Sequence, residues 1–146
     1  MKRLFLITLT LFSMSSHLEA QSSSSWQITW NKKILLQTSK EDETANVKTI
    51  KAAELTDDRF LEVVYKEASA EQEKIWKRSI LFFDDHSHEL MQKDSTRNVK
   101  LSGTDLKQLF GDRSTVKIYT VAYPLDPSLG PRVRVRRVHL CTLELN

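Results

Sequence analysis

Two apolar-rich stretches near the end of the chain, residues 115–123 (TVKIYTVAY) and 133–143 (VRVRRVHLCTL), have the alternating composition of β-strands. The connector between them, residues 124–131, contains all three prolines of the protein. Proline fixes its own backbone angle φ, so this connector has few conformations open to it. The pattern predicts a β-hairpin with a stiff turn, and this hairpin is the strongest single element of the predicted fold.

Further short stretches rich in β-branched, aromatic and aliphatic residues precede the hairpin, separated by polar turns. They are residues 26–30, 34–36, 47–51, 60–65, 73–83, 89–93 and 99–101. Many short strands at close spacing are typical of a mainly β protein with two packed sheets. We therefore expect an immunoglobulin-like β-sandwich of roughly seven to nine strands.

One short helix is predicted at about residues 104–110. Ser102 or Thr104 can cap its first turn, and Asp105 suits the positive end of the helix dipole. An apolar face follows at helical spacing, and Gly111 provides a stop signal.

The first 20 residues predict a secretory signal peptide. Lys2 and Arg3 precede a short apolar run at residues 4–12, and Ala20 offers a small residue for cleavage. The apolar run is shorter than the roughly 20 residues that cross a bilayer. We expect export to the periplasm or beyond, with no membrane span after cleavage, a disordered serine-rich leader at 21–25, and a single β-sandwich domain at 26–146.

The formal net charge of +3 is small and does not indicate a nucleic-acid partner. Cys141 is the only cysteine, so no disulfide can form within the chain. The packing of one compact domain must therefore provide the stability.

Arginines at alternate positions in residues 132–136 predict a row of guanidinium groups on one face of a strand, with Val133 and Val135 on the core face. Such a row suits an anionic glycan, a lipid headgroup or an acidic protein. The proline connector adds preorganised apolar and polar side chains. The predicted partner-binding residues are Tyr123, Leu125, Asp126, Leu129, Arg132, Arg134 and Arg136. A solvated arginine face and a plain structural crossover remain the alternatives.

The turn at residues 84–89 (DDHSHE) is the most metal-like local cluster, because His86 and His88 lie two residues apart and can face one ion together with a carboxylate. A water-exposed hairpin turn is the alternative. A second pair, His139 and Cys141, has the residue types of a nucleophile and its base, whereas its apolar surroundings favour a buried cysteine and a core histidine.

Residues 118–120 (IYT), 124–127 (PLDP) and 132–143, behind a signal peptide and a single capped helix, make the chain resemble the small uncharacterised exported β-domains of Bacteroidota. The resemblance covers the last quarter of the chain. It implies a Gram-negative periplasmic or secreted setting and assigns no functional residues.

The function expected from these features is that of an exported, non-enzymatic binding or assembly module of the bacterial cell envelope, without a cofactor. No phosphate-binding glycine loop, Gly-x-Ser-x-Gly, Cys-x-x-Cys or His-Glu-x-x-His motif is present. Two alternatives stay open: a metal-dependent hydrolase that uses the 84–89 turn, and a binder of anionic glycans or lipid headgroups that uses the arginine face.

Overall fold

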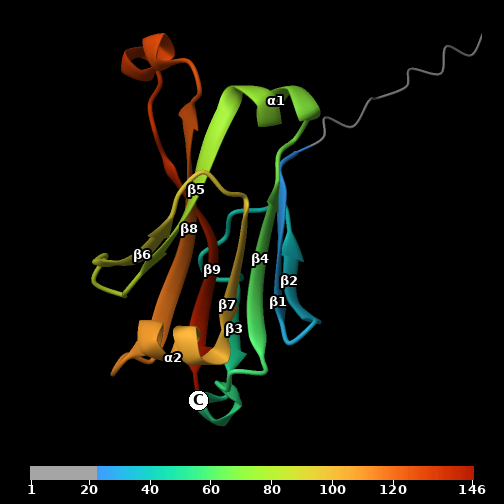
Figure 1. The fold of residues 1–146 in the computed structure, drawn as a ribbon, viewed down its shortest axis with the longest axis vertical. Helices are drawn as coiled ribbons and strands as arrows, with labels where there is room; N and C mark the ends of the chain where they lie inside the picture. The colour runs from blue at the N-terminus through green and yellow to red at the C-terminus, as the bar shows by residue number, and fades with distance from the viewer. Residues whose placement is uncertain (1–22) are drawn as a thin grey trace, which may run out of the picture.

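The computed structural model describes residues 23–146, and within them the chain forms two β-sheets packed face to face, with the described termini at opposite ends (Figure 1). The predicted signal peptide lies outside the described residues, as do the first two residues of the predicted leader. The strands are β1 (Ser25–Trp30), β2 (Lys33–Thr38), β3 (Val47–Ile50), β4 (Phe60–Lys66), β5 (Trp76–Phe83), β6 (Glu89–Lys93), β7 (Asn98–Ser102), β8 (Thr115–Pro124) and β9 (Arg137–Leu145).

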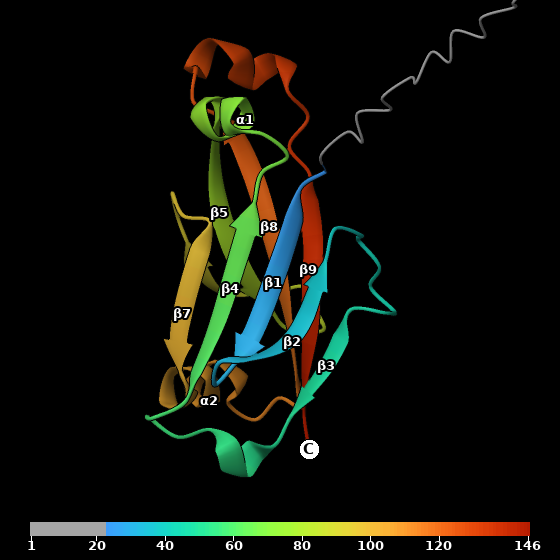
Figure 2. The ribbon, with the colours of Figure 1, turned by 90° about the vertical axis from the view of Figure 1, so that its right-hand side faces the viewer.

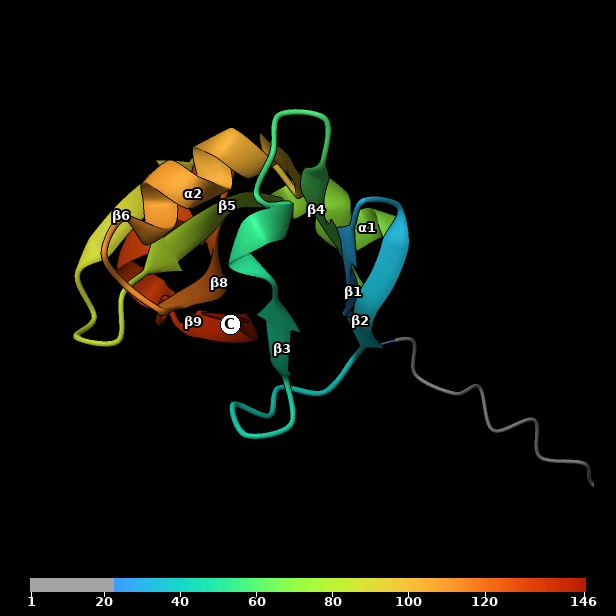
Figure 3. The ribbon, with the colours of Figure 1, turned by 90° about the horizontal axis from the view of Figure 1, so that it is seen from below.

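The four-stranded sheet has the order β2-β1-β4-β7, and the five-stranded sheet has the order β3-β9-β8-β5-β6. Neighbouring strands are antiparallel except β3 and β9, which pair in parallel. Figure 2 shows the four-stranded sheet in front of the five-stranded one, and Figure 3 shows the two layers end on. The predicted mainly β fold, the sandwich of nine strands and the predicted hairpin of β8 and β9 are confirmed within residues 23–146.

Short helices lie at the two ends of the sandwich (Figures 1 and 2). The described helices are the α-helices α1 (Ala70–Ile75) and α2 (Gly103–Phe110) and the 3-10 helices η1 (Ala52–Glu54) and η2 (Pro127–Arg132). The predicted helix at 104–110 is confirmed as α2. The Ser102 side chain accepts from the Asp105 backbone, and the Asp105 carboxylate accepts from the Ser102 backbone, which completes a capping box.

The predicted strand at 73–83 begins three residues too early, because residues 73–75 complete α1 and the strand starts at Trp76. Ser69 caps α1 by accepting a hydrogen bond from the backbone of Gln72. No helix among residues 23–146 is long and apolar enough to cross a membrane.

The core lies between the sheets, where alternate residues of β1, β4 and β7 meet alternate residues of β5, β8 and β9. Ile28, Phe82, Ile118 and Leu143 are fully buried there. The indole nitrogen of Trp26 on β1 donates to the carbonyl of Leu140 on β9 at 2.9 Å, which ties one sheet to the other. Apolar burial of this kind is the main stabilising contribution in a domain without disulfides.

Candidate binding site

The chain between the paired parts of β8 and β9 projects beyond the sandwich at the end where α1 lies (Figures 1 and 2). We call residues 123–136 the arm. It comprises the last two residues of β8, the bend at Leu125 and Asp126, the 3-10 helix η2 and the extended segment 133–136. The backbone N–H of Leu125 donates to the carbonyl of Ile75 at 2.9 Å, so the arm is attached to the end of α1.

Hydrogen bonds fix the conformation of the arm. Asp126 precedes η2, and its Oδ1 accepts from the backbone of Ser128 at 2.9 Å. Hydrogen bonding to the side chain and to the backbone of Ser128 lowers the pKa of Asp126. Pro127 follows at the first helical position, where the missing N–H needs no partner. Asp126, predicted to contact a partner, therefore has a capping role within the arm.

Exposed large apolar side chains gather at this end of the molecule. Among the described residues, seven large apolar residues are exposed, and five of them belong to the arm or to the end of α1. The five are Ile75 (55% exposed), Tyr123 (44%), Leu125 (54%), Leu129 (43%) and Val135 (42%). The other two, Ile34 and Phe60, lie on β2 and β4. Three of the predicted partner-binding residues thus lie together on one projecting surface.

The predicted start of the second hairpin strand at Val133 is wrong, because β9 begins only at Arg137. The ladder of β9 with β8 ends at the pair Arg137 and Val121. Beyond that pair, η2 holds the two limbs of the arm apart, so residues 133–136 are extended without pairing in a sheet. Val135 is exposed and does not face the core, which removes the predicted division into an arginine face and a valine face.

The arginines of the arm differ in their contacts. Arg136 forms an ion pair with Glu41 at 2.7 Å, and the other carboxylate oxygen of Glu41 accepts from the backbone of His139. The side chains of Arg132 and Arg134 form no hydrogen bond or ion pair with any residue in the described part of the chain. Two of the three predicted arginines are therefore exposed cations without a carboxylate partner among residues 23–146.

A cavity of about 240 Å³ lies beneath the arm, between the ends of the two sheets. Its lining residues come from β4, α1, β5, β8, β9 and the arm, and include Tyr65, Glu67, Trp76, Arg78, Arg134 and Arg136. Arg78 and Glu67 form a buried ion pair through two hydrogen bonds of 2.7 and 3.0 Å. Arg97 also reaches Glu67, at 3.3 Å. This cluster was not predicted, because its members are scattered in the sequence and no local pattern joins them.

A second cavity, of about 430 Å³, lies over the outer face of the five-stranded sheet. Phe83 and Tyr119 contribute to its lining, and the guanidinium of Arg137 lies 4.7 Å from the ring centroid of Phe83 and 5.7 Å from that of Tyr119. Burial raises the pKa of the Tyr119 hydroxyl. Arg134 and Arg136 line this cavity as well, so the extended limb of the arm separates the two cavities.

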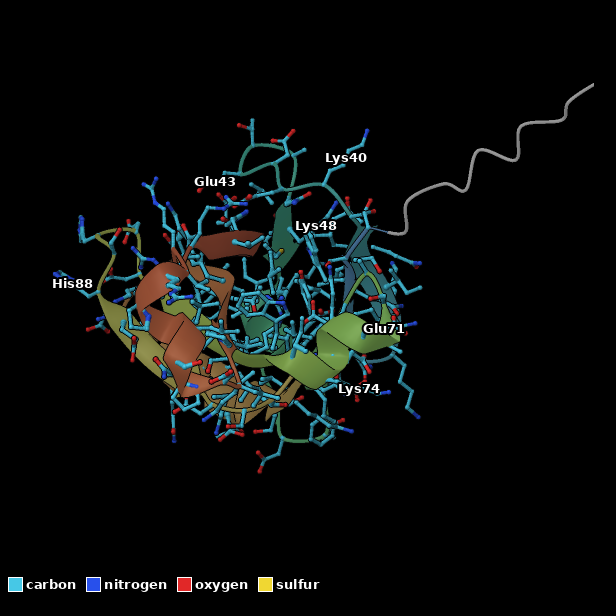
Figure 4. The ribbon with its side chains drawn as sticks, turned by 90° about the horizontal axis from the view of Figure 1, so that it is seen from above. Lys40, Glu43, Lys48, Glu71, Lys74 and His88 are labelled. Carbon is cyan, nitrogen blue, oxygen red and sulfur yellow. The ribbon has the colours of Figure 1, made fainter. Side chains whose placement is uncertain are left out.

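The acidic turn at 84–89 is organised by the carboxylate of Asp84. Oδ1 accepts from the backbone of His86 and of His88, and Oδ2 lies 3.1 Å from Nδ1 of His88. Burial by itself would raise the pKa of Asp84, but these hydrogen bonds lower it overall. The His88 side chain is 76% exposed and points outward in Figure 4.

No group of three His, Cys, Asp or Glu side chains within residues 23–146 is placed to hold a metal ion. The rings of His86 and His88 do come close, at 6.2 Å between centroids, but no third ligand joins them in this region. The geometry matches the water-exposed turn that was the alternative to a metal site.

His139 and Cys141 do not share a face of β9. The register slips opposite Ile118 and Tyr119, so that His139 pairs with Tyr119 while Cys141 pairs with Ile118. Cys141 lies in the core, and burial raises its thiol pKa to about 12. His139 instead contacts Tyr119 and Thr142, with Nε2 2.9 Å from Oγ1 of Thr142. The pair therefore lacks the contact that a nucleophile and its base require.

Comparison with known proteins finds no protein-family model that matches the chain, and no curated protein that matches it either.

Proposed function

We propose that the protein is a non-enzymatic binding or assembly module whose arm docks on an acidic surface of a partner protein. The observation that carries the proposal is the exposure of Ile75, Tyr123, Leu125, Leu129 and Val135 on the arm and the end of α1, next to arginines that have no carboxylate partner in the described part of the chain. Exposed apolar side chains that gather in one place, flanked by polar groups, are typical of interaction surfaces.

The composition and stiffness of the arm favour binding. Tyrosine and arginine are enriched among residues that contribute most to protein interfaces. The Asp126 cap and the prolines hold η2 in one conformation, so little conformational entropy is lost when a partner docks. Tyr123, Leu125 and Leu129 provide apolar contacts, and the arginines provide charge-assisted hydrogen bonds to carboxylates.

The charged residues of the arm and of α1 favour a protein over an anionic membrane as the partner that docks on the arm. The arm carries three arginines and one acidic residue, Asp126, so a complementary surface is acidic. Glu71 and Glu73 lie on α1 at the same end, and Figure 4, which looks down on this end, labels Glu71 and Lys74 there. Acidic side chains at the contact would repel an anionic lipid surface, whereas a protein can match both signs of charge.

We further infer an immunoglobulin-like layout, which supports a binding role for this end. With β1, β4, β5, β6, β7, β8 and β9 taken as strands A, B, C, C′, E, F and G, the sheet orders become A-B-E and G-F-C-C′. The arm then corresponds to the F–G loop, and α1 lies in the B–C loop. Variable domains use these two loops for binding, and by analogy of fold the same end of this domain is suited to bind a partner. The setting we propose is the cell envelope, in keeping with the predicted signal peptide.

Photocrosslinking in the organism that makes the protein tests the proposal. A photoreactive residue in place of Leu129 is expected to capture one protein, and that protein should not be captured from position 34, which is comparably exposed on β2. The substitution Arg132→Glu should remove the Leu129 crosslink, because it reverses a charge on the docking surface. The captured protein, once purified, should bind more weakly as the salt concentration rises.

Crosslinks to lipid alone, or the same proteins captured from positions 129 and 34, would overturn the proposal. Vesicles that contain phosphatidylglycerol serve as the second probe. Binding of the purified protein to these vesicles, abolished by Leu129→Asp, would assign the arm to an anionic membrane instead.

A further inference from the structure

We propose that the cavity beneath the arm is a binding site for a carboxylate group attached to a small apolar or aromatic body. The cavity is lined by Arg78, Arg134 and Arg136 against a single carboxylate, that of Glu67. The inference goes beyond docking of the arm, because a free anion can fill the cavity whether or not a partner covers the exposed apolar side chains.

Positive charge exceeds negative charge at this cavity. Glu67 is the only carboxylate of the lining, and its side chain is 2% exposed. It receives hydrogen bonds from the buried Arg78 and from Arg97, whose side chain is 26% exposed and lies outside the lining, so one carboxylate faces two guanidinium groups. Separating a charge from water is costly unless it is paired, and an anion in the cavity would balance this excess.

Arg78 presents donors that are already held in place. Its guanidinium lies 4.0 Å from the ring centroid of Tyr65, and its side chain is only 8% exposed. Nε and Nη2 donate to Glu67, and Nη1 donates to Oγ1 of Thr120 at 3.3 Å. A guanidinium has five N–H bonds, which leaves two on Arg78 without a partner among the described residues. Donors fixed in advance favour anion binding because no side-chain freedom is lost.

Arg134 supplies the second contact. Its side chain lines the cavity, and it has no hydrogen bond or ion pair with the rest of the described chain. Arg136 also lines the cavity but shares its charge with Glu41. A carboxylate that enters from the arm side therefore meets one free guanidinium at the rim and one rigid guanidinium within the lining. Two guanidinium groups can bind a carboxylate through charge-assisted hydrogen bonds.

The other lining residues indicate the chemistry of the ligand beyond its carboxylate group. Tyr65, Trp76, Ala122, Val133 and Val138 supply the apolar part of a lining that is otherwise polar. Inorganic phosphate would leave this surface uncovered, whereas an aromatic or aliphatic carboxylate would cover it. The volume of about 240 Å³ is below the range of about 300 to 1,000 Å³ found for sites that take drug-sized ligands, so the ligand is small. It is either a free carboxylic acid or the carboxyl end of a partner chain.

Isothermal titration of the purified protein with benzoate tests the site. Saturable binding is expected, with phosphate at least tenfold weaker because it gains nothing from the apolar walls. Arg134→Gln should weaken benzoate binding by about tenfold, which corresponds to about 1.4 kcal/mol. Arg132→Gln is the matched control, since it removes the same charge from the arm outside the cavity lining, and it should change the affinity less than twofold.

A short peptide that ends in phenylalanine distinguishes the two sources of the carboxylate. If the peptide binds more tightly than benzoate and amidation of its terminus abolishes binding, the ligand is the end of a partner chain. If only benzoate binds, the ligand is a free acid. No saturable binding of either probe, or equal losses in the Arg132 and Arg134 variants, would overturn the site. The crosslinking result at Leu129 does not depend on whether benzoate or the peptide binds. The docking proposal and the cavity proposal can therefore fail separately.

Discussion

The guanidinium of Arg78, on β5, lies over the ring of Tyr65, on β4, at 4.0 Å from the ring centroid. The two residues belong to different sheets, so this cation–π contact spans the interior of the sandwich. The Tyr65 ring also stacks with Trp26 at an interplanar angle of 6°. The polar cluster of Arg78, Glu67 and Arg97 thus joins the two sheets directly beneath the proposed binding surface.

Glu67→Gln is expected to destabilise the fold by about 3 to 5 kcal/mol, because it leaves the buried Arg78 without a carboxylate partner. The measurement is the free energy of unfolding from urea denaturation. Glu62→Gln is the control, since the Glu62 to Lys100 pair lies on the surface and contributes about 1 kcal/mol or less. Equal losses in both variants would contradict the role assigned to the cluster.

Gly103→Ala is expected to destabilise the fold by about 1 to 3 kcal/mol through overpacking. A Cβ at Gly103 would overlap the backbone oxygen of Thr56 and lie 2.5 Å from its backbone nitrogen, and neither atom can move as a side chain can. Gly130→Ala in η2 is the matched control, because nothing lies within 4 Å of its added Cβ. Thermal unfolding of the two variants measures the difference, and a loss at Gly130 as large as that at Gly103 would refute the argument.

The stability of the fold is expected to decrease as the pH falls below about 6.5. Burial lowers the pKa of His139, while Glu43, Glu41 and Asp42 favour its protonation and Lys117 opposes it. Because the pKa is lower in the folded state, the unfolded chain binds a proton in this window that the folded chain does not. The contribution of neutral His139 to stability is therefore fully present above the pKa that this histidine has in the unfolded chain. It is lost as the pH falls toward the lower pKa that the histidine has in the folded protein.

Urea denaturation at a series of pH values from 7.5 to about 5 measures this effect. In His139→Gln the slope of stability against pH in this window should become smaller. A slope that is unchanged in the variant would show that other groups cause it. His86→Gln is the control, because that imidazole lies in an exposed turn.

Cys141 is expected to resist alkylation in the native state. Its thiol is fully buried, and a pKa of about 12 leaves almost no thiolate at pH 8. Mass spectrometry after iodoacetamide treatment should show unmodified protein under native conditions and full modification in urea. Rapid modification of the native protein would mean that this part of β9 opens readily.

The sequence predicts best those elements whose signals are local. Ser102, Asp105 and Gly111 lie within one stretch, and they mark the two ends of α2 correctly. The start of β9 was misplaced because Val133 and Val135 alternate with arginines as a strand would, although η2 keeps the two limbs of the arm apart. Alternation shows only that a segment suits a sheet. It does not show that a partner strand lies within reach.

The candidate site could be predicted only in part. The proline connector is contiguous in sequence, so the exposure of Leu125 and Leu129 follows from its composition, whereas the exposure of Val135 does not. Glu67, Arg78 and Arg97 come from separate segments, and only the packing of the sheets brings them together. Strand periodicity alone would place His139 and Cys141, two residues apart, on one face, whereas the register shift opposite Ile118 and Tyr119 turns them to opposite faces.

The position of β9 between β3 and β8 has a consequence for the folding order of the chain. β3 precedes β9 by more than half of the described residues, and it pairs in the five-stranded sheet with β9 alone. The five-stranded sheet therefore cannot form completely until residues 137–145 have been synthesised. Contacts between segments so distant in sequence slow folding. A nascent chain that stops before β9 leaves the edge of β8 open and β3 without a neighbour, so the last strand determines when the domain can become native.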